Sequence, residues 1–74
     1  MGELTAGSYY INMASAAAVA ERGHEWQRAA RLWEQAEAVA RHALNRDWSS
    51  TRMQFCLRQW RYTDAAQKMS GVRG

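Results

Sequence analysis

The chain has 74 residues, of which 47% are hydrophobic and 23% charged, and its formal net charge at pH 7 is +3. One domain with one small core is expected at this length, and the composition excludes a disordered polar chain. The single cysteine, Cys56, excludes an internal disulfide and suits a reducing cytoplasm. Proline is absent and the few glycines lie outside the periodic runs, so an all-α chain is predicted.

The first two predicted helices form a hairpin. The first runs over about 8–22, with Ser8 as its N-cap and Gly23 as the left-handed residue that ends it. The second runs over about 25–44 and ends at Asn45, which tolerates the same left-handed conformation. A tight turn at Gly23 would lay the two helices side by side.

A third helix is predicted over about 48–69, with Asp47 as its N-cap. Residues 1–7 and 70–74 are expected to be disordered or frayed ends of a single 1–74 domain. The longest run of small residues, 14–20, is too short to span a bilayer, so no membrane is expected.

Tryptophan and alanine alternate along the second helix at steps of three and four residues, which places them on one face. This side of the second helix is expected to pack on an alanine-lined side of the first helix, where small side chains leave room for the large tryptophan rings. The predicted architecture is a tetratricopeptide-like hairpin plus a third helix, packed as a compact three-helix domain. Its predicted core consists of Trp26, Ala29, Trp33 and Ala36, joined by Trp48 and Phe55 of the third helix.

The third helix has more apolar surface than one core needs. Trp48, Phe55 and Tyr62 form one stripe, which is assigned to the core. A second stripe is assigned to a partner interface, because an apolar stripe without an internal partner usually marks one. The alternative is that this second stripe covers the edge of the core. The predicted interface consists of Met53, Leu57, Trp60 and Arg61.

No enzyme site, metal site or cofactor site is predicted. His24 and Glu25 begin like the zinc motif HExxH, but Arg28 occupies the place of the second histidine and His42 lies far along the chain. An enzyme with Cys56 or a serine as nucleophile remains a third alternative, although Cys56 lies mid-helix on the expected core side.

Several residues match a known family pattern. They lie in the first helix and its turn, along the second helix, and at the start of the third: Ala17, Ala18, Glu21 to Gly23, Trp26, Ala29, Ala30, Trp33, Ala36, Asn45, Trp48, Arg52, Phe55 and Cys56. Over about residues 9–56 the chain resembles the ANR family, small bacterial negative regulators of AraC-type transcription activators. The ending 45–56 is the most distinctive part, since helix formation alone does not demand those residues.

The resemblance implies a cytoplasmic regulator without enzymatic activity or cofactor. Such a protein binds an AraC-type activator, blocks its dimerisation or DNA contact, and so lowers virulence-gene expression. The contact surface is expected on the third helix or on the outer hairpin face with Leu32 and Val39, and homo-oligomer formation is left open. The alternative is a small helical nucleic-acid-binding protein that uses Arg58, Arg61 and Lys68, although interleaved acidic residues predict weak or absent DNA binding.

Overall fold

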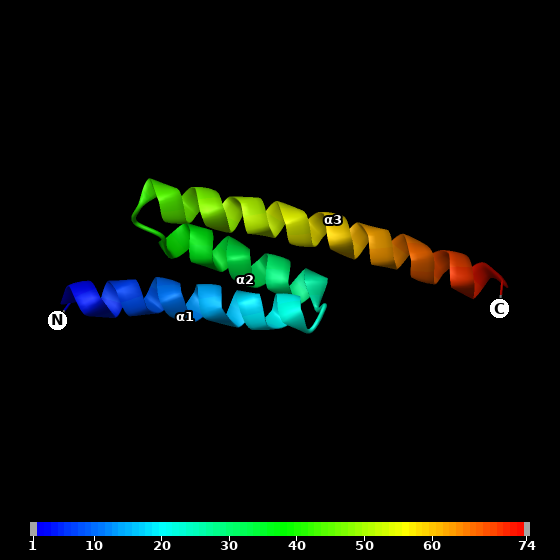
Figure 1. The fold of residues 1–74 in the computed structure, drawn as a ribbon, viewed down its shortest axis with the longest axis horizontal. Coiled ribbons are helices and arrows are strands. Elements are labelled where there is room, and N and C mark those ends of the chain that lie inside the picture. Colours follow the sequence, from blue (N-terminus) through cyan, green and yellow to red (C-terminus); the bar gives the residue numbers. More distant parts are fainter. Residues whose placement is uncertain (1, 74) are drawn as a thin grey trace.

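The computed structural model describes the backbone of residues 2–73 and the side chains of residues 9–65. Within 2–73 the chain forms three helices and no strand: α1 (Gly2–Arg22), α2 (Trp26–Val39) and α3 (Ala43–Arg73). Figure 1 shows them in this order, each antiparallel to the one before it. The predicted all-α fold, a helical hairpin followed by a third helix, is confirmed.

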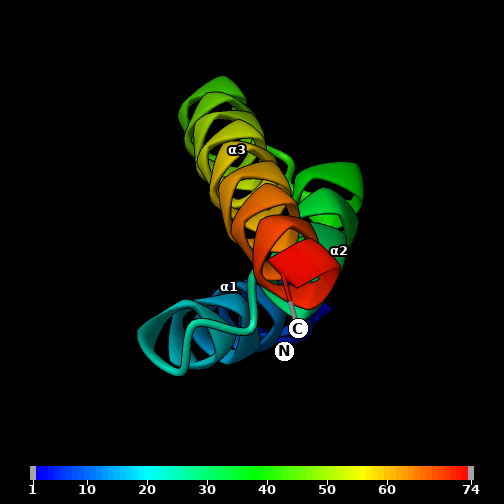
Figure 2. The same ribbon diagram turned by 90° about the vertical axis from the view of Figure 1, so that its right-hand side faces the viewer.

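Helix α2 lies between the other two helices. It packs along both α1 and α3, whereas α1 and α3 meet at only a few positions. In the end-on view of Figure 2, α3 runs from the top to the centre, α2 lies to its right and α1 lies at the lower left. The molecule measures 56 × 19 × 14 Å. It is elongated because α1 extends beyond α2 at one end and α3 extends beyond α2 at the other (Figure 1).

The first turn differs from the prediction by one residue. His24 has φ 58°, whereas the described glycines include none with positive φ, so the left-handed residue is His24 and not Gly23. The Glu25 amide donates to the Ala20 carbonyl at 2.9 Å, and the His24 amide donates to the Glu21 carbonyl at 2.9 Å. These two bonds define a Schellman motif, in which the left-handed residue normally favours glycine. Here histidine occupies that place.

The second turn also differs. Helix α2 ends at Val39, Ala40 is extended (φ −71°, ψ 130°), and α3 begins at Ala43. Asn45 and Asp47 therefore lie inside α3, and neither is the helix-ending residue or the N-cap that was predicted. The Arg46 guanidinium donates to the Arg41 carbonyl at 2.9 Å and to the Ala40 carbonyl at 3.4 Å. A side chain from the next helix thus satisfies carbonyls after α2, so no glycine or asparagine is needed there.

Helix α1 begins at Gly2, so Ser8 lies within the helix and is not its N-cap. The side chains of residues 1–7 and 70–74 lie outside the described ones, and the predicted fraying of both ends stays a prediction.

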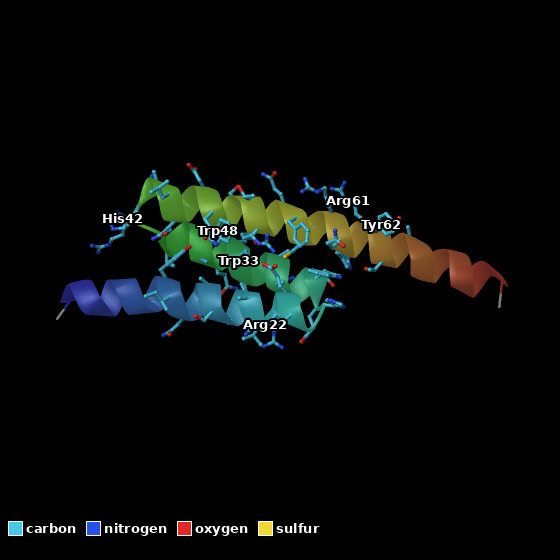
Figure 3. All side chains as sticks on the ribbon, in the orientation of Figure 1. Arg22, Trp33, His42, Trp48, Arg61 and Tyr62 are labelled. Carbon is cyan, nitrogen blue, oxygen red and sulfur yellow. The ribbon has the colours of Figure 1, made fainter. Side chains whose placement is uncertain are left out.

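The core is made mostly of alanine around one tryptophan. Trp33 is 4% exposed at the centre of the three helices (Figure 3). The buried cluster consists of Ala17 and Ala20 of α1, Ala29, Ala30, Trp33 and Ala36 of α2, and Cys56 of α3. Trp26 and Phe55 are half-buried against this cluster, with their rings edge to face at 5.8 Å. The predicted alanine-lined hairpin is therefore present, because small residues on α1 leave room for the Trp33 ring.

The face that α3 buries is displaced from the predicted one, although Cys56 lies on the core side as expected. Ser49 and Cys56 are fully buried, whereas Trp48 is 55% exposed and Tyr62 79% exposed. The assignment of Trp48 to the core is wrong, and so is that of Tyr62. The small side chains of Ser49 and Cys56 let α3 lie close to α2, and this rotation carries the large rings outward. The predicted interface residues Met53 and Leu57 instead pack against the core from the other side of the buried face.

Candidate protein-binding surface

A mostly buried polar cluster connects the three helices. Glu21, near the end of α1, accepts a hydrogen bond from Nε1 of Trp33 in α2 and forms an ion pair with Arg52 in α3. The Nε of Arg52 also donates to Glu21 Oε2 at 3.2 Å. Only 12% of the Glu21 side chain and 29% of the Arg52 side chain are exposed. One carboxylate therefore holds together all three helices.

The electrostatics of this cluster favour its charged form. Burial opposes ionisation of Glu21, but hydrogen bonds from Arg52 and Trp33 and the charge of Arg52 outweigh it, so the pKa of this carboxyl is lowered. The hydrogen bond to Glu21 raises the pKa of Arg52. The guanidinium carbon also lies 4.6 Å from the centre of the Phe55 ring and 5.6 Å from that of Trp48, within the range of cation–π attraction.

Cys56 lies next to this cluster and is buried completely. Burial, followed by the negative charge of Glu21, raises the pKa of the thiol to about 11. The thiol is therefore protonated at neutral pH, whereas a nucleophilic cysteine reacts as the thiolate. Because the Glu21 carboxylate is held ionised by its donors, neither group is set up for acid–base or nucleophilic chemistry.

Some of the residues named for the ANR resemblance lie in or beside this cluster. Glu21, Trp33, Arg52 and Cys56 form it, and Trp48 and Phe55 lie around the Arg52 guanidinium. Sequence reasoning did not predict the role of Glu21, although a carboxylate in the last turn beside an alanine face was the available signal.

A second polar link joins the middle of the first helix to the third helix, one turn before Arg52. The Tyr10 hydroxyl lies 3.1 Å from the Ser49 hydroxyl and 3.4 Å from the Asn45 carbonyl, to which it donates. This link explains why a serine is fully buried on α3, and it was not predicted.

The external surface of interest is a groove of about 210 Å³ between α2 and α3. Met53, Leu57 and Trp60 line it from α3, and Ala30 lies on its α2 side. Gln27, Arg31 and Glu34 of α2 complete the lining. The three apolar residues predicted for the partner interface are therefore brought together, and Trp60 is 37% exposed.

Arg61 does not line this groove. Figure 3 shows it on the side of α3 away from α1 and α2. Trp60 instead connects the groove to a second hollow of about 370 Å³, which His24 to Arg28 line from the first turn and the start of α2, and Thr63 and Asp64 from α3. Of the outer hairpin residues, Leu32 packs against the core cluster.

Metal-ligand side chains are scattered among the described residues. No group of three or more His, Cys, Asp or Glu residues among them could hold a metal ion. The His24 ring stacks on Trp26 instead, with ring centres 5.2 Å apart and planes inclined by 14°. Within the described residues, no helix is both long and apolar enough to cross a membrane.

Comparison of the chain with family models, curated proteins and solved structures found no match.

Proposed function

We propose that this protein is a negative regulator of transcription that acts by protein–protein contact. It binds an AraC-type virulence activator in the α2–α3 groove and blocks the activator's dimerisation or DNA contact. The observation that carries the proposal is the partly exposed Trp60 ring at the end of a groove with apolar side chains from Met53 and Leu57. The ANR resemblance supplies the class of partner.

The groove suits the apolar face of an amphipathic helix. Two antiparallel helices, α2 and α3, form its walls, and apolar anchors of a bound helix would lie between them at steps of three and four residues. Arg31 and Glu34 place one charge of each sign along the α2 wall, where they meet polar residues at the rim of a partner. A tryptophan in such a position commonly contributes a large share of binding energy.

The test replaces Trp60 by alanine and titrates the variant against purified AraC-type activators of enteric bacteria. Affinity should fall about thirtyfold, because truncation of an interface Trp can cost about 2 kcal/mol. The melting temperature should change little, because Trp60 is partly exposed and does not belong to the buried cluster. Val19→Ala is the matched control, because Val19 is 57% exposed on α1 and lies outside the groove.

Two results would contradict this proposal. Strong destabilisation of Trp60→Ala would show that the ring belongs to the core. Tight, sequence-selective binding of a DNA duplex at physiological salt would favour the nucleic-acid alternative, with Arg58 and Arg61 as phosphate contacts.

A further inference from the structure

Helix α3 carries a second apolar surface, mostly outside its contact with α2. Trp48, Phe55 and Tyr62 recur every seven residues, and Leu44 precedes Trp48 by four. Leu44 is 83% exposed, Trp48 55% and Tyr62 79%, while Phe55 is half-buried. We call these four residues the α3 seam. Their spacing matches the a and d positions of a coiled coil, and they extend over about 27 Å at 1.5 Å per residue.

Apart from Phe55, whose ring meets Trp26 of α2, the seam is separate from the faces that α3 already uses. At 100° per residue, it lies about a third of a turn from the buried Ser49 and Cys56, and on the opposite side of the helix from Met53 and Leu57. Neither α1 nor α2 covers Leu44, Trp48 or Tyr62, as their exposure shows. Exposed aromatic side chains in a continuous line are costly for a monomer in water.

We infer that the seam is covered by the α3 seam of a second copy of this chain, which runs antiparallel to the first and generates a twofold dimer. In this register Leu44 packs beside Tyr62 of the second copy, and Phe55 packs near the dimer axis. Each contact occurs twice, as a twofold interface requires.

Charge complementarity selects the second copy and its direction. Asp47 and Arg61 lie on the same flank of the seam, both are exposed, and the ion pairs of the described side chains involve neither. The antiparallel register brings Asp47 of each copy beside Arg61 of the other. It also places Arg58 opposite the Trp48 ring of the second copy, in position for cation–π attraction.

A parallel dimer would place like charges together. Arg58, which lies between Phe55 and Tyr62 on the seam, would then face Arg58 of the other copy. Asp47 of one copy would lie about 21 Å along the helix from Arg61 of the other, at 1.5 Å per residue, too far to form an ion pair. In the antiparallel dimer the two copies of Arg52 lie near the axis, where each is already paired with its own Glu21. The α2–α3 groove stays open in this dimer, so the inference does not depend on the proposed function.

The experiment measures the dimer dissociation constant by sedimentation velocity for the full chain and three charge variants. The unmodified chain should form dimers as its concentration rises. Asp47→Arg and Arg61→Asp alone should each weaken the dimer about tenfold, because each replaces two attractive pairs by two repulsive ones. Asp47→Arg combined with Arg61→Asp should restore the original dissociation constant, since the pairs form again with reversed sign.

The charge variants should keep the fold, because both side chains are exposed and neither takes part in an ion pair within the described part of the chain. Circular dichroism and thermal unfolding check this. Tyr62→Ala is a second probe of the same seam and should also weaken the dimer. A chain that stays monomeric at every concentration overturns the inference. A dimer unaffected by the single variants, or one that the double variant fails to restore, overturns this interface and this direction.

Discussion

Replacing Glu21 by glutamine tests whether one carboxylate holds the three helices together. Glutamine has the same size and keeps an oxygen that can accept from Trp33, but it removes the charge that pairs with Arg52. Removing one partner of a fully buried ion pair costs about 3–5 kcal/mol. Since 29% of the Arg52 side chain is exposed, water reduces this cost, and we expect a loss of about 2 kcal/mol.

That loss is large for a chain of this size, whose total stability should be about 4–11 kcal/mol. Urea unfolding followed by circular dichroism should show the midpoint lower by about 1–2 M. Glu25→Gln is the matched control, because Glu25 lies 3.8 Å from Arg28 and both side chains are mostly exposed. Its effect should stay below about 0.5 kcal/mol.

The dependence on pH gives an independent check. The folded state lowers the pKa of Glu21 below the ordinary value of 4.5, so its stabilisation is fully present above pH 4.5 and is lost as the pH falls through the lowered value. The stability difference between the natural chain and Glu21→Gln should therefore be constant from pH 7 to 5 and shrink in acid. A difference below about 0.5 kcal/mol at pH 7, or one that does not change in acid, would refute the role given to this ion pair.

Two further predictions concern the first turn and the buried thiol. His24→Gly should stabilise the protein by about 0.5–1 kcal/mol, because glycine adopts φ 58° without steric cost; lower stability in urea unfolding would show that the stacking of His24 on Trp26 matters more. Cys56 should react with iodoacetamide at pH 8 far more slowly in the folded chain than in urea. The free energy of unfolding should fall as the pH rises from 9 to about 11, because in that range the thiol ionises only in the unfolded chain. Equal labelling rates in both states would contradict the burial of this residue.

The sequence predicts the hairpin well because the pattern that encodes it is strong and local. Tryptophan and alanine at helical spacing leave one arrangement for α1 and α2, and Trp33 lies where that spacing places it. The turns were less predictable. Gly23 and His24 are adjacent, and hydrogen bonding of the whole turn decides which of them is left-handed. The end of α2 depends on Arg46, a residue of the next helix.

The orientation of α3 could not be predicted from hydrophobicity. Its two apolar stripes are similar in size, and counting large side chains favours burial of the aromatic one. The structure instead buries Ser49 and Cys56, because close approach to α2 depends on small residues and on the polar partners of Ser49 and Arg52. Part of the candidate site was still predicted, since Met53, Leu57 and Trp60 lie together, whereas Arg61 lies outside the groove.

The placement of α2 between two helices that scarcely meet has a consequence for folding. Because α1 packs on α2 and α2 on α3, nearly all contacts join consecutive helices, which favours rapid folding. The same arrangement divides the domain into two overlapping helix pairs, and either outer helix would open alone if nothing else coupled them. The Glu21–Arg52 ion pair and the Tyr10–Ser49 hydrogen bond connect these outer helices directly. All-or-none unfolding of the 74-residue chain therefore depends on a few polar side chains, and their loss would let α1 exchange its amide hydrogens independently of α3.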